Sequence, residues 1–320
     1  MRVTTRIALL DDHQQVALGL ADWSSLPHTE VISFKDALRG EALVRALADI
    51  DVVVLMRERT AFPAEVIARL PRLRLIVSTG LRNAVIDREA CARAGIVLAG
   101  ARGAKNGLAV TAETAWALIL ALHKRVVPLH LATVRGEWQP ALSLPLDGRT
   151  LGIVGLGNIG RHMARVALAF GMHVIAWSPN LSDERAAEAG VRRVDKAELF
   201  AGADVVSLHL VLSASTEGVV GAAELARMKP GAFLVNTARA GLVDEPALMT
   251  ALQQGRLGGA GLDVFWDEPL PASHPLCALP NVVLTPHIGY VTEENLAAYY
   301  RNVLRAINTW MSGGEPVLLG

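Results

Sequence analysis

The stretch Leu151-Gly-Ile-Val-Gly155-Leu-Gly157-Asn-Ile-Gly160 decides the fold of this chain. An apolar run of strand length leads into the pattern G-x-G-x-x-G, and a segment of helical length, 161–170, follows. Gly171 stands where that helix would end, and the apolar run 173–177 completes a strand–helix–strand unit. The helix N-terminus in such a unit binds the pyrophosphate of a dinucleotide. The residues predicted to bind it are Gly155, Gly157, Asn158, Ile159 and Gly160.

Short apolar runs alternate with amphipathic segments along the rest of the chain. The first series comprises Ile7–Leu10, Val31–Phe34, Val52–Leu55, Leu75–Ser78 and Ile96–Leu98. The second comprises Leu151–Val154, Val174–Trp177, Val205–Leu208, Phe233–Asn236, Gly261–Val264 and Val282–Leu284. Helices are expected at Glu41–Leu47, Ala64–Leu70 and Arg88–Ala94. This alternation predicts the α/β class, with two Rossmann-like domains whose parallel sheets are covered on both faces.

The two series define the predicted domains. They are separated by Ala109–Val127, an apolar stretch of helical length. Thr292–Met311 has the pattern of one long helix, with Thr292 as its N-cap and Gly313–Gly314 as its stop. If that helix returns to the first series, the outer domain is discontinuous. We therefore predict a flavodoxin-like domain of residues 1–100 and 288–320, with a dinucleotide-binding domain of residues 101–287 inserted in it.

Composition excludes several classes of protein. The chain has 31 basic and 31 acidic residues, so no basic excess indicates a nucleic-acid surface. Its two cysteines, Cys91 and Cys277, are far apart in sequence and do not suggest a disulfide framework or a C-x-x-C metal site; they fit a reducing, cytoplasmic compartment. The run Ile7–Leu10 ends too early for a signal peptide, and no apolar stretch is long enough for a bilayer. We expect no metal, no nucleic-acid partner and no membrane partner.

The segment after the second strand of the dinucleotide unit departs from the usual pattern. An acidic residue normally stands there, about 20 residues after the glycines, and binds the ribose 2′-hydroxyl. This chain has Ser178, Pro179 and Asn180 instead. A neutral serine does not repel a 2′-phosphate, and Arg185 is the nearest basic side chain. The cofactor is therefore predicted to be NAD or NADP, with a slight preference for NADP.

Three later segments place one candidate group each after an apolar strand: Arg239, Glu268 and His287. Reduction of a 2-oxo acid needs a cation that holds the carboxylate, and the planar fork of arginine does this. It also needs an acid that protonates the developing alkoxide, and histidine titrates in the right range. A carboxylate beside that histidine would favour the imidazolium and fix its orientation. Singly these could be a surface arginine, a solvated glutamate and a core histidine; together, downstream of a dinucleotide fold, they indicate catalysis.

At these residues, and over nearly its whole length, the sequence resembles the D-isomer-specific 2-hydroxyacid dehydrogenase family. Further similar stretches are Met56–Thr60, Ser78–Asp87 and Asp204–Leu210. The resemblance implies D-specific hydride transfer between NAD(P)H and C2 of a small 2-oxo or 2-hydroxy acid, with Arg239, Glu268 and His287 as catalytic residues. It implies further cofactor contacts at His209, Thr237, Ala238, Asp263 and Gly289. It implies substrate contacts at Gly80, Leu81, Arg82, Arg239 and Tyr290, with backbone N–H groups of residues 80–82 offered to the carboxylate. It also implies a homodimer joined through the cofactor domains at helix Ala109–Val127.

Departures from the family leave the specific acid open. Arg82 stands where a glycine is common, and Tyr290 stands where a small residue is common. Glu268 argues against the formate dehydrogenase branch, which pairs its histidine with glutamine. One alternative is a nucleotide-sensing, corepressor-like binding protein of the same fold. Another is a Rossmann enzyme similar to S-adenosylhomocysteine hydrolase or alanine dehydrogenase, although those lack this order of arginine, glutamate and histidine.

Overall fold

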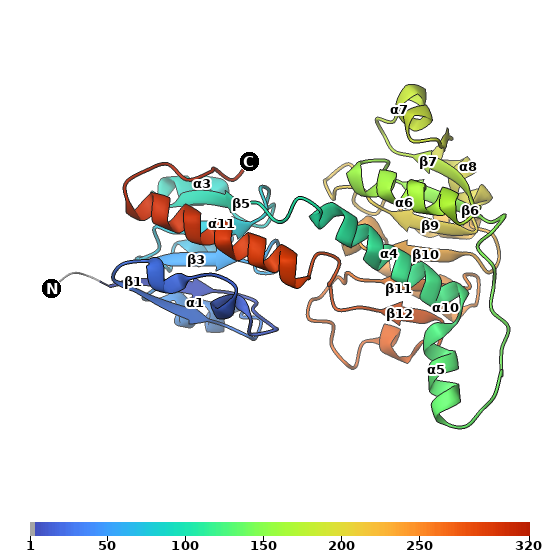
Figure 1. Cartoon of the computed structure of the whole chain (residues 1–320), viewed down its shortest axis with the longest axis horizontal. Helices are drawn as coiled ribbons and strands as arrows, with labels where there is room; N and C mark the ends of the chain where they lie inside the picture. Colours follow the sequence, from blue (N-terminus) through green and yellow to red (C-terminus); the bar gives the residue numbers. More distant parts are fainter. Residues whose placement is uncertain (1–3) are drawn as a thin grey trace. The chain divides into compact units, whose positions relative to one another are not determined.

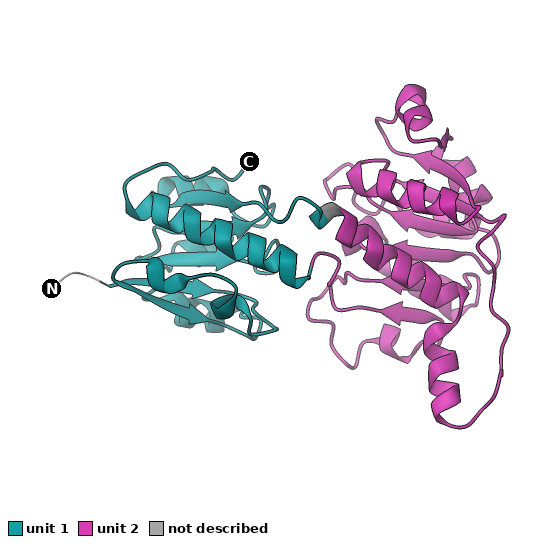
Figure 2. Ribbon diagram, in the orientation of Figure 1, with its two compact units in different colours: residues 1–107, 291–320 teal, residues 108–290 magenta. Residues whose placement is uncertain are grey.

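The computed structural model describes residues 4–320, which form two compact units (Figure 2). Unit 1 consists of the chain up to residue 107 together with 291–320, and unit 2 consists of 108–290. The first unit is therefore discontinuous, with the second inserted in it. The unit boundaries lie at 107/108 and 290/291, rather than at the predicted 100/101 and 287/288.

Side-chain contacts explain both shifts of the boundary. Residues 101–107 stay with unit 1 because Asn295 Oδ1 accepts a hydrogen bond from the Ala104 N–H (2.9 Å). Residues 288–290 stay with unit 2 because Asp263 accepts from the N–H groups of Ile288 and Gly289, each at 2.8 Å. The periodicity of apolar residues carries no information about such contacts.

Unit 1 is a five-stranded parallel sheet in the order β2-β1-β3-β4-β5, which is the flavodoxin-like order. Its strands are β1 (Thr5–Leu9), β2 (Thr29–Ser33), β3 (Val52–Leu55), β4 (Leu75–Thr79) and β5 (Val97–Ala101). Its helices are α1 (Gly40–Leu47), α2 (Ala64–Ile67), α3 (Arg88–Arg93) and α11 (Glu293–Met311). Helices α1, α2 and α3 pack on one face of the sheet, and α11 lies across the other (Figure 1). Thr292 caps α11 as predicted, because its side chain accepts from the Asn295 N–H.

Unit 2 is a seven-stranded parallel sheet in the order β12-β11-β10-β9-β6-β7-β8. Its strands are β6 (Thr150–Val154), β7 (His173–Trp177), β8 (Arg192–Arg193), β9 (Val205–Leu208), β10 (Phe233–Asn236), β11 (Gly259–Leu262) and β12 (Val282–Leu284). Its helices are α4 (Gly107–His123), α5 (Val126–Val134), α6 (Asn158–Ala169), α7 (Asp183–Glu188), α8 (Lys196–Gly202), α9 (Ala222–Arg227) and α10 (Glu245–Gln253). Strand β6 pairs with β7 on one side and β9 on the other, so the order reverses at β6, where α/β sheets bind their ligands.

The predicted single helix Ala109–Val127 is wrong. It forms two helices, α4 and α5, which are bent by 58°. The break lies at Arg125, whose φ of 52° is left-handed and interrupts the helical hydrogen bonds. Among the described residues, no single helix is long and apolar enough to cross a membrane. Within that part of the chain, only α4 and α5 taken together, as a bent pair, reach the required length and apolar composition.

Candidate active site

The glycine-rich turn joins β6 to α6. Gly155 has a φ of 105°, and a Cβ there would lie 2.7 Å from the backbone carbonyl carbon of His209. A Cβ at Gly160 would collide with the Gly155 carbonyl oxygen. At Gly157, the N-cap of α6, a Cβ would meet nothing within 4 Å, so there is open space over the helix N-terminus. The turn thus brings an uncovered helix end to the sheet's switch point, where a pyrophosphate is favoured.

The segment after β7 contains no carboxylate. Ser178 is half-buried, and Pro179 and Asn180 are exposed. Arg185, in α7, donates from Nη1 to the Asn180 carbonyl (3.4 Å). This contact places a guanidinium beside the segment that normally reads the ribose. Lys196 lies 5.8 Å from the centre of the Trp177 ring, but its ammonium is paired with Glu224 at 2.9 Å.

Two polar residues follow β9 and β10. His209 Nε2 lies 2.9 Å from Ser207 Oγ, and burial lowers the pKa of His209 to about 4, so its imidazole is neutral at physiological pH. Thr237 is buried, and its hydroxyl has no hydrogen-bond partner within residues 4–320. A buried hydroxyl left without a partner costs free energy, so a ligand with a polar group here would complete the site.

Asp263 fastens the segment after β12 to the end of β11. Its side chain is fully buried and accepts from Thr285 Oγ1 at 2.7 Å, as well as from the N–H groups of Ile288 and Gly289. Burial raises the pKa of Asp263, an effect that these hydrogen bonds and the nearby His287 oppose. The bonds hold the backbone on both sides of His287, whose φ of 54° is left-handed.

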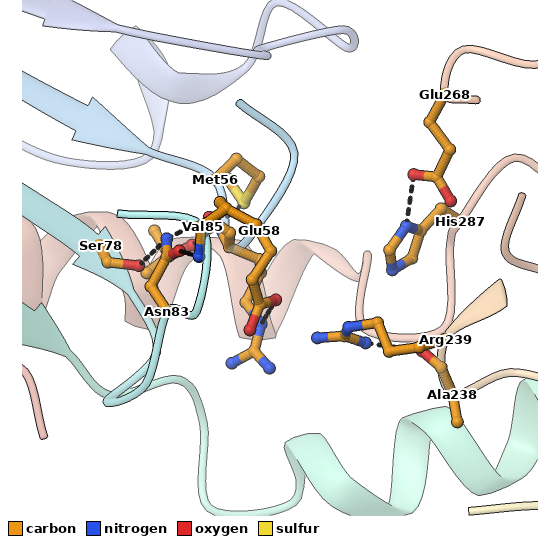
Figure 3. Close-up of polar contacts among 11 residues, drawn as sticks. Met56, Glu58, Ser78, Asn83, Val85, Ala238, Arg239, Glu268 and His287 are labelled. Carbon is orange, nitrogen blue, oxygen red and sulfur yellow. Dashed lines mark hydrogen bonds and ion pairs between the residues drawn. The ribbon is translucent and has the colours of Figure 1, made fainter. Parts of the chain in front are cut away.

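Glu268 and His287 form a hydrogen-bonded pair in unit 2 (Figure 3). His287 Nδ1 lies 2.7 Å from Glu268 Oε2, and Glu268 Oε1 accepts from the Phe265 N–H at 2.9 Å. The side chains of His287 and Glu268 are 16% and 24% exposed, which leaves the pair reachable from solvent. The Tyr290 ring packs edge-on at 5.7 Å between ring centroids. The pair therefore joins an oriented imidazole to a carboxylate.

Arg239 is held in a turn after β10. Its Nη1 donates to the Ala238 carbonyl at 2.6 Å (Figure 3). The buried Asn236 closes this turn: its Nδ2 donates to the Arg239 carbonyl (2.9 Å), and its Oδ1 accepts from the Ala238 N–H (3.0 Å). Arg239 and His287 thus follow the carboxyl ends of β10 and β12, on either side of β11. The role of Asn236 was not predicted; its position at the end of an apolar strand was the only signal.

In unit 1 the predicted substrate loop follows β4. The Gly80 N–H donates to the Ala101 carbonyl at 2.6 Å, so it is not offered to a ligand. The N–H groups of Leu81 and Arg82 make no hydrogen bond with any described residue. Two of the three predicted donors are thus available.

Two residues of unit 1 that were not predicted shape this loop. Asn83 is buried, and its Nδ2 donates to the Arg57 carbonyl (2.7 Å) and Ser78 Oγ (3.1 Å) (Figure 3). Arg57 has a left-handed φ of 55°, its N–H donates to Thr79 Oγ1 (2.9 Å), and its guanidinium packs directly against Gly80. The stretch 56–60 resembles the family in sequence, but its pattern does not reveal this contact.

Comparisons of the sequence and of the structure with known proteins agree on one family. The model of the D-isomer specific 2-hydroxyacid dehydrogenase NAD-binding domain matches residues 116–289. D-3-phosphoglycerate dehydrogenase from Archaeoglobus fulgidus is 36% identical over 265 residues, covering 82% of this chain and 50% of that protein. This chain thus spans about half the length of that relative.

Two other proteins match over most of their own length. Glyoxylate reductase from Aeropyrum pernix is 38% identical over 239 residues, which cover 72% of this chain and 71% of that enzyme. The structure of a phosphoglycerate oxidoreductase from Vibrio cholerae has 37% identity and a TM-score of 0.90, covering 97% of this chain and 100% of that one. The chain therefore belongs to the D-isomer specific 2-hydroxyacid dehydrogenase family.

Proposed function

We propose that this chain is an oxidoreductase that acts at C2 of a small 2-oxo or 2-hydroxy acid, with D specificity and a nicotinamide dinucleotide as its cofactor. The observation that carries the proposal is the 2.7 Å contact between His287 Nδ1 and Glu268 Oε2. Membership in the family supports it, as do the names of the relatives, which act on 2-hydroxy or 2-oxo acids.

The residues around the glycine-rich turn fit the cofactor. The open helix N-terminus at Gly157 suits a pyrophosphate. The Thr237 hydroxyl, which has no hydrogen-bond partner among the described residues, suits a polar group of the ligand. When bound, the cofactor supplies or accepts the hydride. The residues that would hold it are Gly155, Gly157, Asn158, Ile159, Gly160, Ser178, Pro179, Asn180, His209, Thr237, Ala238, Asp263 and Gly289.

The side chains of unit 2 would divide the rest of the chemistry. A carboxylate accepts hydrogen bonds only, so Glu268 fixes the proton of His287 on Nδ1 and stabilises the imidazolium. His287 Nε2 then donates a proton to the C2 oxygen during reduction and takes it back during oxidation. Arg239 binds the substrate carboxylate and polarises the C2 carbonyl. Glyoxylate and hydroxypyruvate are the first substrates to try. Arg82 and Tyr290 are the candidate residues for limiting the size of the acid that binds.

Of the two nicotinamide dinucleotides, we propose NADP as the cofactor. Residues 178–180, directly after β7, include no carboxylate that would repel a 2′-phosphate, and the Arg185 guanidinium lies at the Asn180 carbonyl. In this proposal Arg185 supplies the positive charge that pairs with the 2′-phosphate.

A panel of 2-oxo acids assayed with NADH and with NADPH, by loss of reduced nicotinamide, tests the proposed function. We expect turnover of at least one small 2-oxo acid. Binding of the dinucleotide without turnover of any acid in the panel would instead favour the corepressor-like alternative.

We also propose that the chain forms a homodimer. The contact that we favour is α5 with the segment after it, rather than α4, whose apolar side chains pack in the core. Val134, Trp138 and Leu142 are 72%, 81% and 89% exposed, so large apolar side chains on α5 and after it face solvent. A second copy meeting the same patch would form a two-fold interface. Light scattering should give twice the chain mass for the parent and for Leu318→Asp, but the mass of one chain for Val134→Asp.

A further inference from the structure

The segment after α11 pairs with the edge of the unit 1 sheet. The Gly100 N–H donates to the Val317 carbonyl (2.8 Å), and the Leu319 N–H donates to the Leu98 carbonyl (3.2 Å). The pairing is antiparallel, with a bridge between Ala99 and Leu318. Residues 317–319 thus form a short added strand beside β5.

Leu319 anchors this strand. Its side chain is 2% exposed and belongs to the core cluster that contains Ala90, Cys91 and Ile96. Its carbonyl accepts from Arg88 Nη2 at 2.6 Å. The neighbouring Leu318 is 66% exposed, so the strand is held at one buried position.

The next residue contacts the predicted substrate loop. The Gly320 N–H donates to the Leu81 carbonyl at 2.8 Å. From the other side, β5 closes against the same loop: a Cβ at Gly100 would lie 2.9 Å from the Gly80 carbonyl oxygen and 3.3 Å from Leu81 Cα. The loop is therefore held between β5 and the added strand.

Covering an exposed sheet edge is the simplest role for such a strand. That role needs only the hydrogen bonds to Leu98 and Gly100. The bond from Gly320 to Leu81 lies beyond the edge, and Leu81 is not part of β5. Edge protection therefore leaves this bond unexplained.

The planarity of the peptide group links the Gly320–Leu81 hydrogen bond to the orientation of the Arg82 N–H. The Leu81 carbonyl and the Arg82 N–H belong to one planar trans peptide unit and point in opposite directions. A hydrogen bond that fixes the carbonyl therefore fixes the direction of the Arg82 N–H. That N–H makes no hydrogen bond with any residue in the described part of the chain.

We propose that residues 317–320 are a positioning element, which aims the Arg82 N–H at the carboxylate of the substrate by holding the Leu81 carbonyl. This inference rests on the proposed function for the identity of the ligand. It assigns to residues 317–320 a role in substrate binding that is separate from the roles of Arg239, Glu268 and His287.

Two pairs of variants test the proposal. Gly320→Pro removes the N–H that holds Leu81, whereas Gly320→Ala keeps it, and the added Cβ would lie 3.4 Å from the Leu81 oxygen. Leu319→Ala removes the buried anchor, whereas Leu318→Ala trims its exposed neighbour. For each variant we would measure KM and kcat for the best 2-oxo acid, the cofactor Kd, the Tm, and the Arg82 amide signal by NMR.

Gly320→Pro and Leu319→Ala should raise KM about threefold to tenfold, the effect of one misplaced hydrogen bond, and should move the Arg82 amide signal. Their kcat and cofactor Kd should stay near the parent's, and both control variants should match the parent. An unchanged KM in Gly320→Pro, or an equal rise in Gly320→Ala, would overturn the proposal. So would a joint loss of kcat, cofactor affinity and Tm, since that indicates general damage to the fold. A parent that reduces no 2-oxo acid refutes the proposed function, whereas an unmoved Arg82 signal in Gly320→Pro refutes the positioning role alone.

Discussion

His287 Nδ1 and Glu268 Oε2 are 2.7 Å apart, although the residues lie 19 positions apart in the sequence. The carboxylate is fixed in turn by the Phe265 N–H, and the backbone around His287 is fixed by Asp263. Because both partners are held by neighbouring structure, the imidazole has one defined orientation. The pair is thus suited to proton transfer at Nε2, and the roles of its members can be separated by substitution.

Replacing His287 with alanine should lower turnover of a 2-oxo acid by about a hundredfold or more, because the proton donor is lost. The Kd of the reduced cofactor should stay close to the parent's, since the glycine-rich turn is unchanged. Steady-state kinetics and a fluorescence titration of the cofactor measure the two quantities. Turnover equal to the parent's would remove His287 from the mechanism.

Glu268→Gln should change the pH dependence of reduction. Reduction needs the protonated imidazole, so kcat/KM falls as the pH rises and the imidazolium loses its proton. Glutamine keeps the size of the side chain but removes the negative charge that favours the imidazolium. The pH at which kcat/KM is half its maximum should therefore move down.

The chain offers a matched control for this change. Glu245 Oε1 lies 2.9 Å from His274 Nε2, which makes a second glutamate–histidine pair in unit 2. Neither residue is predicted to bind cofactor or substrate, so Glu245→Gln should leave the pH profile where the parent has it. A Glu268→Gln profile that stays in place or moves to higher pH is incompatible with the assigned role of Glu268.

Buried strands and strand-end residues could be predicted from the sequence. The fully buried ranges Val52–Leu55, Val205–Leu208 and Phe233–Asn236 match the structure residue for residue, as does the half-buried edge strand Val282–Leu284. Parallel strands that are covered on both faces need continuous apolar runs, so the pattern and the fold coincide there. Strand β8 was missed because Arg192 and Arg193 lie exposed at the sheet edge. The predicted strand Gly261–Val264 is displaced, because β11 begins at Gly259, which pairs with Phe233.

Contacts that depend on distant residues or unusual backbone could not be predicted. Arg57 reaches Gly80 from a left-handed backbone conformation, which arginine rarely adopts. The bond from Gly320 to Leu81 joins residues far apart in the sequence, and no local pattern encodes it. The placement of Arg239, Glu268 and His287 after apolar strands could be predicted from the sequence. The hydrogen bond from the Asn236 side chain to the Arg239 carbonyl could not.

Ser178→Asp should shift cofactor preference towards NADH. A carboxylate at this position repels a 2′-phosphate and binds a free 2′-hydroxyl. The measurement is the ratio of kcat/KM with NADPH to that with NADH, in the parent and in the variant. Ser312→Asp, which adds the same charge in unit 1, should leave the ratio unaltered. An equal ratio in the parent and in Ser178→Asp would mean that this position does not read the ribose.

Hydride transfer from a deuterated cofactor to C2 can be detected as deuterium in the product. The decisive measurement uses reduced nicotinamide cofactor carrying deuterium at both C4 positions, and the fastest-reduced 2-oxo acid of three or more carbons. Mass spectrometry and chiral chromatography should find a D-2-hydroxy acid with one deuterium at C2, formed at least about a hundredfold more slowly by His287→Ala. A product without deuterium at C2, or an L-2-hydroxy acid, would contradict the proposed reaction.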